Sequence, residues 1–238
     1  MMISAATTHA LDDIAQREVE MRAAFTPGAA ATHSEIAAPP SLERDLSPLS
    51  VAPSGDGYFV VRDSAGGELF TEDGAFGLEH GTLVDRNGMP VLGYSRSGTL
   101  APLKLDPIDE ALGRVRNLHI EADGALAYEK AAIDPLTRQP DRIKVVVGRI
   151  ALARFSAATR LESVDHTRWR APSGIPPHLG VPQDGNFLPL VPYAHRGSAI
   201  DPLTGIERLQ ESYLAFDALR AAHNAQGRVE KMAMDLLK

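Results

Sequence analysis

The middle of the chain is a series of short runs in which apolar and polar residues alternate, with glycine-containing turns among them. The runs have the length and composition of β-strands. They are residues 58–61, 68–71, 82–84 and 89–92. Three dipeptides of the kind that favours type I′ hairpin turns accompany them: Asp56-Gly57, Asp73-Gly74 and Asn87-Gly88. The pattern predicts a hairpin at each dipeptide and an antiparallel β-meander.

The C-terminal stretch carries apolar residues that advance by three or four positions, as core positions of a coiled coil do. They are Leu209, Tyr213, Phe216, Leu219, Ala222, Ala225, Val229, Met232 and Leu236. Gly227 interrupts this helix and costs about 1 kcal/mol of helix stability relative to alanine. We therefore expect a weak helix that needs a partner. The sequence leaves open whether it lies back on its own domain or pairs with other helices.

A second helix is expected over residues 8–25, which lack glycine and proline and carry a loose apolar stripe that includes Leu11 and Ile14. Pro27 and Gly28 end this helix. Within the chain, only this helix could cover the C-terminal seam.

The same patterns divide the chain into four segments. They are an N-terminal helix over 1–26, an extended linker over 27–53, a β-rich body over 54–198 and a C-terminal helix over 199–238. The end of the body, from Ala171 on, is rich in proline, which cannot donate to a sheet ladder. We expect irregular loops and edge strands there.

Residues 48–93 resemble the shared core of the bacterial flagellar axial proteins, the rod and hook family. We call the residues that carry the resemblance most clearly the family motif. They are Gly55, Asp56, Gly57, Tyr58, Phe59, Asp73, Gly74, Phe76, Gly88 and Pro90. Residues 118–124 and 148–152 resemble later strands of that family and follow in the same order.

The resemblance implies a mainly β fold, with an antiparallel, hairpin-rich central domain flanked by terminal helices that pair in the assembly. It implies a structural subunit of the flagellar basal-body rod, most like a short proximal-rod protein, that assembles helically with itself or related axial subunits and transmits torque. Such a subunit lies in the periplasmic rod and leaves the cell through the flagellar type III export apparatus without cleavage of a signal peptide.

The resemblance also gives the terminal helices a role, because in that family they pair when subunits stack. The expected assembly seam consists of Leu11, Ile14, Leu209, Tyr213, Phe216, Leu219, Val229, Met232 and Leu236. Both termini depart from the family pattern, with residues 16–20 and 200–207 replacing its characteristic segments. A β-rich adaptor that derives from the family and no longer polymerises is therefore the alternative. For a subunit that polymerises, we expect a monomer with a folded β body and frayed ends.

Composition narrows the remaining classes of protein and of partner. The chain has 238 residues, of which 44% are hydrophobic, so it can bury a sizeable core. A net charge of −7 argues against nucleic acid as a partner. No segment has the roughly 20 apolar residues of a membrane-spanning helix. The first ten residues contain no lysine or arginine, so we expect no signal peptide.

Catalytic and metal-binding patterns are missing from the sequence. It has no cysteine, and its eight histidines form neither His-x-His nor His-Glu-x-x-His. His166 follows Asp165, but no Gly-x-Ser-x-Gly element supplies a nucleophile. We therefore expect no enzyme, cofactor or metal site, and a hydrolase is the least favoured class. Trp169 is expected to be a strand residue that faces the core rather than a recognition aromatic.

Overall fold

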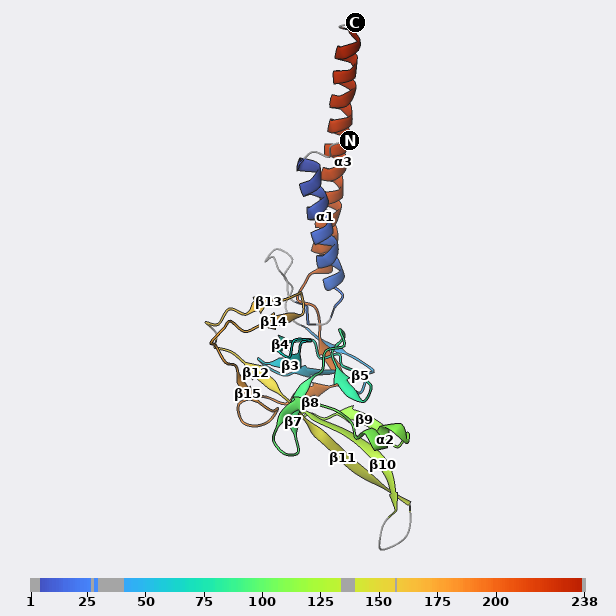
Figure 1. The fold of residues 1–238 in the computed structure, drawn as a ribbon, viewed down its shortest axis with the longest axis vertical. Helices are drawn as coiled ribbons and strands as arrows, with labels where there is room; N and C mark the ends of the chain where they lie inside the picture. Colours follow the sequence, from blue (N-terminus) through green and yellow to red (C-terminus); the bar gives the residue numbers. More distant parts are fainter. Residues whose placement is uncertain (1–4, 27, 30–40, 134–139, 157, 237–238) are drawn as a thin grey trace. The chain divides into compact units, whose positions relative to one another are not determined.

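The computed structural model describes residues 5–26, 28–29, 41–133, 140–156 and 158–236. These residues form two compact units. One contains the first and last helices, and the other contains the strands and a short helix. The chain is mainly β with antiparallel sheets and a helix toward each end, so the expected fold class is confirmed (Figure 1).

Two larger sheets make up most of the β unit. The six-stranded sheet has the order β13 (Glu162–Ser163), β14 (Arg168–Arg170), β4 (Glu68–Thr71), β3 (Tyr58–Arg62), β12 (Leu152–Arg154) and β15 (His178–Gly180). The five-stranded sheet has the order β8 (Leu100–Pro102), β7 (Leu92–Ser95), β11 (Pro140–Ile150), β10 (Ala125–Ile133) and β9 (Arg116–Ile120). Every neighbouring pair in both sheets is antiparallel.

Three two-stranded ladders and one short helix complete the β unit. They are β1 (Leu42–Arg44) with β17 (Ala194–Arg196), β2 (Val51–Pro53) with β16 (Leu190–Pro192), β5 (Gly77–Glu79) with β6 (Thr82–Val84), and α2 (Pro107–Ala111). The Asp106 side chain caps α2 by accepting the backbone N–H of Ile108.

The strands expected at 58–61, 68–71 and 82–84 are confirmed as β3, β4 and β6. The run at 89–92 is strand only at its end, because β7 begins at Leu92. Pro90 and Val91 make isolated bridges to Val84 and Val61 instead. The predicted edge strand after Ala171 is β15, which lies at one edge of the six-stranded sheet.

Four hairpin turns of the β unit share one form. In each, the carbonyl of the first residue accepts the N–H of a glycine three positions later, and that glycine has positive φ. The turns are Asp63–Gly66, Asp85–Gly88, Ser95–Gly98 and Glu121–Gly124. This is the three-residue hairpin loop that ends in a left-handed residue. The hairpin at Asn87-Gly88 is thus present, but the predicted type I′ turn is wrong, since Asn87 does not have positive φ.

The hairpins predicted at Asp56-Gly57 and Asp73-Gly74 are wrong. The strand before Asp56 is β2, which pairs with β16 rather than with β3. Gly74 instead lies where two backbones meet: its carbonyl accepts the N–H of Val51 at 3.0 Å, and a Cβ atom at Gly74 would lie 1.7 Å from the Val51 carbonyl oxygen. Glycine is required there for a close approach of backbone rather than for a turn.

The main hydrophobic core draws on both larger sheets. Phe59 and Leu69 of the six-stranded sheet pack in one buried cluster with Leu126 and Ile150 of the five-stranded sheet. Phe76 meets Phe59 edge to face, with ring centroids 5.0 Å apart. A second cluster on the other side of β3 contains Val60 and Phe70.

Part of the segment expected as an extended linker belongs to sheets. Residues 42–44 and 51–53 are strands β1 and β2, and the side chains of Val51 and Ala52 are fully buried. Their partner strands lie about 140 to 150 residues later in the proline-rich end of the body. Pairing at this sequence distance leaves no local periodicity, which is why the segment resembles a linker. Residues 27 and 30–40 of the expected linker lie outside the described residues.

The helical unit consists of α1 (Ala5–Ala23) and α3 (Pro202–Leu236), which pack along one another. The helix predicted over 8–25 thus begins three residues earlier and ends two residues earlier. The two helices are antiparallel, and α3 continues past the start of α1 (Figure 1). Among the described residues, no helix is long and apolar enough to cross a membrane.

Candidate assembly surface

The helix pair is held by polar contacts as well as by apolar packing. Ser212 Oγ donates to Asp13 Oδ2 at 2.7 Å, and this hydrogen bond is the main reason that the pKa of Asp13 lies below its ordinary value. Tyr213 Oη donates to Glu18 Oε1 at 2.5 Å, which raises the pKa of Tyr213. A Cβ atom at Gly205 would lie 3.2 Å from Met21 Sδ, so the backbone of α3 approaches α1 closely there.

These contacts place the two helices together within one chain. The resemblance implies that they pair only when subunits stack. The structure differs in this respect, because α1 covers the first half of α3 within a single chain. Fraying of both ends in a free subunit stays a prediction. The expectation that only the N-terminal helix could cover the seam in the same chain agrees with this arrangement.

The structure buries only part of the expected assembly seam. Ile14 is 6% exposed, and Leu209 and Phe216 are half-buried. The exposed members are Leu11, Tyr213, Leu219, Val229 and Met232. Leu236 is the last residue of α3, and its side chain lies outside the described residues.

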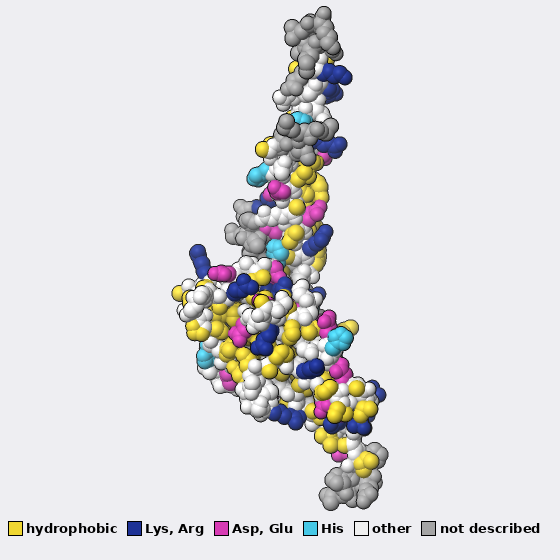
Figure 2. Space-filling model, viewed as in Figure 1, with side chains coloured by type: hydrophobic (Ala, Val, Ile, Leu, Met, Phe, Trp, Pro, Cys, Tyr) yellow, Lys and Arg dark blue, Asp and Glu magenta, His cyan; other side chains and the backbone are white. Residues whose placement is uncertain are grey.

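The second half of α3 is where the seam is uncovered. Helix α3 has 35 residues and α1 has 19, so at 1.5 Å per residue α3 is longer by about 24 Å. Every residue from 217 to 229 is exposed, and Val229 and Met232 are 66% and 65% exposed. Figure 2 shows hydrophobic side chains at the surface of the helical unit among charged ones.

Other exposed apolar residues of the helical unit lie outside the expected assembly seam. They are Val19 and Phe25 on or just after α1, and Leu203, Ile206 and Leu214 on α3. Ile206 and Leu203 continue the α3 seam toward the start of the helix in steps of three residues and were not predicted, whereas Leu214 lies beside that seam. Val19 and Phe25 belong to the loose apolar stripe expected over residues 8–25. The adjacent pair Tyr213-Leu214 is the signal that the apolar surface of α3 is wider than one seam.

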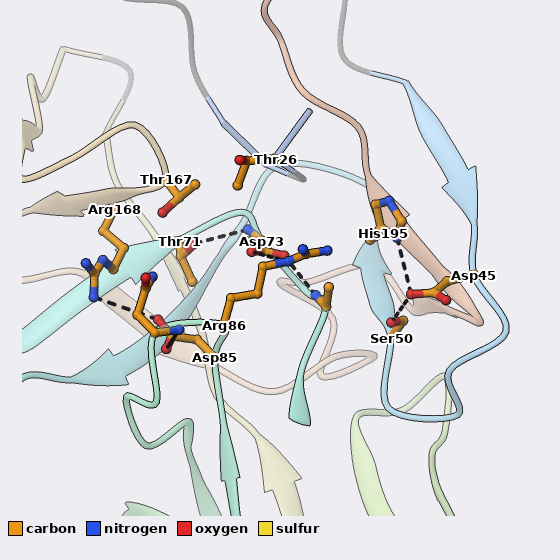
Figure 3. Close-up of polar contacts among 12 residues, drawn as sticks. Thr26, Asp45, Ser50, Thr71, Asp73, Asp85, Arg86, Thr167, Arg168 and His195 are labelled. Carbon is orange, nitrogen blue, oxygen red and sulfur yellow. Dashed lines mark hydrogen bonds and ion pairs between the residues drawn. The ribbon is translucent and has the colours of Figure 1, made fainter. Parts of the chain in front are cut away.

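The family-motif residue Asp73 is the centre of a buried polar cluster in the β unit (Figure 3). Its Oδ1 accepts the N–H of Ala75 at 2.9 Å, and its own N–H donates to Thr71 Oγ1 at 3.0 Å. Arg86 Nε lies 3.2 Å from its Oδ2. Burial raises the pKa of Asp73 to about 6, although the Ala75 N–H and Arg86 act in the opposite direction.

The neighbouring Asp85 holds the turn that contains Gly88. Its Oδ1 accepts the N–H groups of Asn87 and Met89, each at 2.8 Å. Arg168 lies 4.0 Å from Asp85 and also donates to Asp165. These contacts give Asp73 and Asp85 a structural role.

Two histidines, His195 and His166, bear on the idea of a catalytic triad. Asp45 Oδ2 accepts from Ser50 Oγ at 2.5 Å and lies 3.5 Å from His195 Nδ1 (Figure 3). The carboxylate thus stands between serine and histidine, whereas nucleophilic catalysis needs the histidine next to the serine. Asp165 is the neighbour of His166. Burial acts to raise the pKa of Asp165, but Arg168 and Thr167 donate hydrogen bonds to its carboxylate and hold the pKa below the ordinary value.

The described part of the chain contains no group of three His, Asp or Glu side chains that could hold a metal ion.

One comparison with known proteins gives a match. Residues 52–128 match the family model of the flagellar hook protein FlgE/F/G D1 domain. The match covers about a third of the chain, contains every residue of the family motif and leaves out both terminal helices. No curated protein matches the chain. The match supports a flagellar axial structural protein of the hook and rod type rather than an enzyme.

Proposed function

We propose that this chain is a structural subunit of the flagellar basal-body rod that assembles helically with itself or with related axial subunits and transmits torque. The observation that carries this proposal is the second half of α3, where Val229 and Met232 are exposed on a helix that continues past its partner α1. Exposed apolar surface of this kind is removed from water by association. The similarity of residues 52–128 to the hook-protein D1 domain supports the same class of assembly.

A helical polymer follows from contacts between unlike surfaces. A subunit that binds its neighbour through two different surfaces propagates a filament when the rotation between neighbours does not close a ring. In the proposed rod, the assembly seam along α1 and α3 supplies such surfaces, and the body over 54–198 forms the outer layer. Rod rather than hook is favoured because a chain of 238 residues has no room for a large inserted outer domain. The position would be proximal, in the periplasm, after export through the flagellar apparatus without cleavage.

One observation favours the alternative of an adaptor that no longer polymerises. Helix α1 already covers the first half of α3 in a single chain, so part of the seam needs no second subunit. The two proposals differ in what the second half of α3 contacts: neighbouring axial subunits in the rod, and no axial subunit in the adaptor.

The test is electron microscopy of isolated basal bodies, with a deletion strain complemented by the unchanged chain or by variants. The double variant Val229→Asp and Met232→Asp places two charges on the seam. His223→Asp and Asn224→Asp, made together, are the matched control, because they add two charges at exposed polar positions of the same helix. For a rod subunit, deletion and the seam variant both truncate the rod and abolish motility, and the control does neither. Normal basal bodies in the deletion strain would contradict the rod function and support the adaptor.

A further inference from the structure

A pocket of about 430 Å³ lies at one end of the six-stranded sheet, entirely within the β unit. Its volume is within the roughly 300–1,000 Å³ typical of small-molecule sites. The residues that matter for its chemistry are Asp56, Tyr58, Glu72, Arg154, Phe155 and Trp169. They come from the turn before β3, from β3, β12 and β14, and from the residues directly after β4 and β12.

The strand register explains why aromatic side chains gather here. Phe70 pairs with Val60 on one side and with Trp169 on the other, and residues directly opposite each other share a face of a sheet. Tyr58 lies two residues before Val60 and therefore on that same face. The face is the one opposite Phe59, which points into the main core. Trp169 is thus half-buried on this second face, not in the main core where the sequence predicts it.

The aromatic rings form a corner rather than a stack. Tyr58 and Trp169 have ring centroids 5.6 Å apart at an interplanar angle of 63°, and Tyr58 and Phe155 have centroids 6.1 Å apart at 64°. All three side chains are half-buried. Rings that meet edge to face, and that are not fully covered, leave flat apolar surface on the pocket wall.

Acidic and basic groups balance around the rings. Glu72 Oε1 accepts from Arg196 Nη1 at 2.7 Å, so this carboxylate is paired. Arg154 Nη1 donates to the carbonyl of Asn186 at 3.1 Å, and its guanidinium lies over the Phe187 ring, 5.5 Å from the ring centroid. Asp56 is exposed and, among the described residues, has no ion-pair or hydrogen-bond partner. The pocket therefore offers one open carboxylate beside an aromatic corner.

We propose that this pocket binds a neutral oligosaccharide. The C–H faces of a pyranose ring carry partial positive charge and pack against the negative faces of aromatic rings. Sugar hydroxyls donate to a carboxylate in charge-assisted hydrogen bonds, for which Asp56 is available. A cation is disfavoured, because the two guanidiniums at the site offset its two carboxylates. A purely apolar ligand would remove Asp56 and Arg154 from water without hydrogen bonds.

The single tryptophan of the chain makes the proposal directly testable. Because Trp169 is the only tryptophan, all tryptophan emission of the purified protein reports from this pocket. Titration with tri-N-acetylchitotriose or cellotriose is expected to change the emission saturably, with a Kd of about 1 mM or lower. Tetramethylammonium is the cationic comparison and is expected to give no saturable change.

Variants separate binding at the pocket from other effects. Asp56→Ala removes the open carboxylate and is expected to weaken sugar binding about tenfold, the size of one charge-assisted hydrogen bond. Asp141→Ala removes another exposed carboxylate, from β11 in the other sheet, and is expected to leave binding unchanged. Urea unfolding of both variants checks that the fold is intact.

Three results would overturn the proposal. The first is the absence of a response to either sugar at about 10 mM, which is ten times a Kd of about 1 mM. The second is a saturable response to tetramethylammonium. The third is sugar binding by Asp56→Ala that equals the binding by the unchanged chain. A change in emission with protein concentration alone would overturn it as well, because a neighbouring copy would then occupy the pocket. Since the titration uses the free subunit, its outcome does not depend on whether the chain assembles into a rod.

Discussion

The β unit and the helical unit differ in the size of their buried cores. In the β unit, Phe59, Leu83 and Tyr128 are completely buried. In the helical unit, Leu214 is 70% exposed, and the second half of α3 has exposed apolar residues. The comparison teaches that the β unit is stabilised by its own core, whereas the helices carry apolar surface that a single chain leaves in contact with water.

The largest expected effect comes from a methyl group at Gly74. Its Cβ would lie 1.7 Å from the carbonyl oxygen of Val51, so Gly74→Ala must force β2 away from its neighbours. We expect a loss of about 4 kcal/mol or more in the free energy of unfolding, measured in urea. Gly77→Ala is the control, since a Cβ at Gly77 meets nothing within 4 Å. Equal stability of the two variants would show that the β unit is not as tightly packed as described.

Replacing a leucine by alanine in each unit measures directly how much the burial of apolar side chains contributes to stability. Leu83→Ala removes a completely buried side chain and is expected to cost about 2–5 kcal/mol. Leu214→Ala removes an exposed one and is expected to change the free energy of unfolding of the monomer by at most about 0.5 kcal/mol. A large cost for Leu214→Ala in the monomer would mean that the helical surface is already covered in the free subunit.

Loss of the proton from Asp73 should make the β unit less stable as pH rises. Its pKa is about 6 in the folded chain against 3.8 as the ordinary value, so between these values the folded state keeps a proton that the unfolded state has lost. The stabilisation is therefore fully present below about pH 4 and lost as pH rises through about 6, by about 2–3 kcal/mol.

Asp73→Asn isolates this contribution, because the amide oxygen can still accept the N–H of Ala75. Unfolding free energies at pH 4 and pH 8 are compared for the two proteins. Between pH 4 and pH 8, the unfolding free energy of the unchanged chain should fall by about 2–3 kcal/mol relative to that of Asp73→Asn. A constant difference across this range would contradict a raised pKa.

The smallest expected effect is at Gly227 in the second half of α3. Gly227 is exposed, and a Cβ there meets nothing within 4 Å, so Gly227→Ala is expected to stabilise the helix by about 1 kcal/mol. Hydrogen exchange should show slower exchange in residues 220–232 and no change in the β unit. Slower exchange in both units would mean that they unfold together.

The sequence predicts the strands of the β unit better than it predicts the turns. Alternation in 58–61 and 68–71 is a local property, and both runs are strands in the structure. The dipeptide Asp73-Gly74 has the residues of a hairpin turn, but its glycine serves a backbone contact with Val51, which lies 23 residues earlier. A dipeptide carries no information about such a contact, and this is why the predicted hairpin is wrong.

The candidate sites show the same difference between local patterns, which the sequence predicts, and contacts between distant residues, which it does not. The spacing of Leu209, Phe216 and Val229 predicts an apolar seam, but it does not tell which part α1 covers, since this depends on the relative length and register of two helices. The pocket at Trp169 was not predicted, because it depends on which strands are neighbours. Trp169 reaches Tyr58 only because β14 and β3 both pair with β4.

The pairing of β1 with β17 has a mechanical consequence. These are the first and last strands of the β unit, and Leu42 lies opposite Arg196, so the chain enters and leaves the unit at one place. A pull that separates the two chain ends would break this ladder one hydrogen bond at a time, starting from Leu42 and Arg196. A pull that acts on both ends in the same direction loads the two strands together and leaves the hydrogen bonds between them unstretched. Force on the two chain ends therefore reaches the β unit through this one pair of strands.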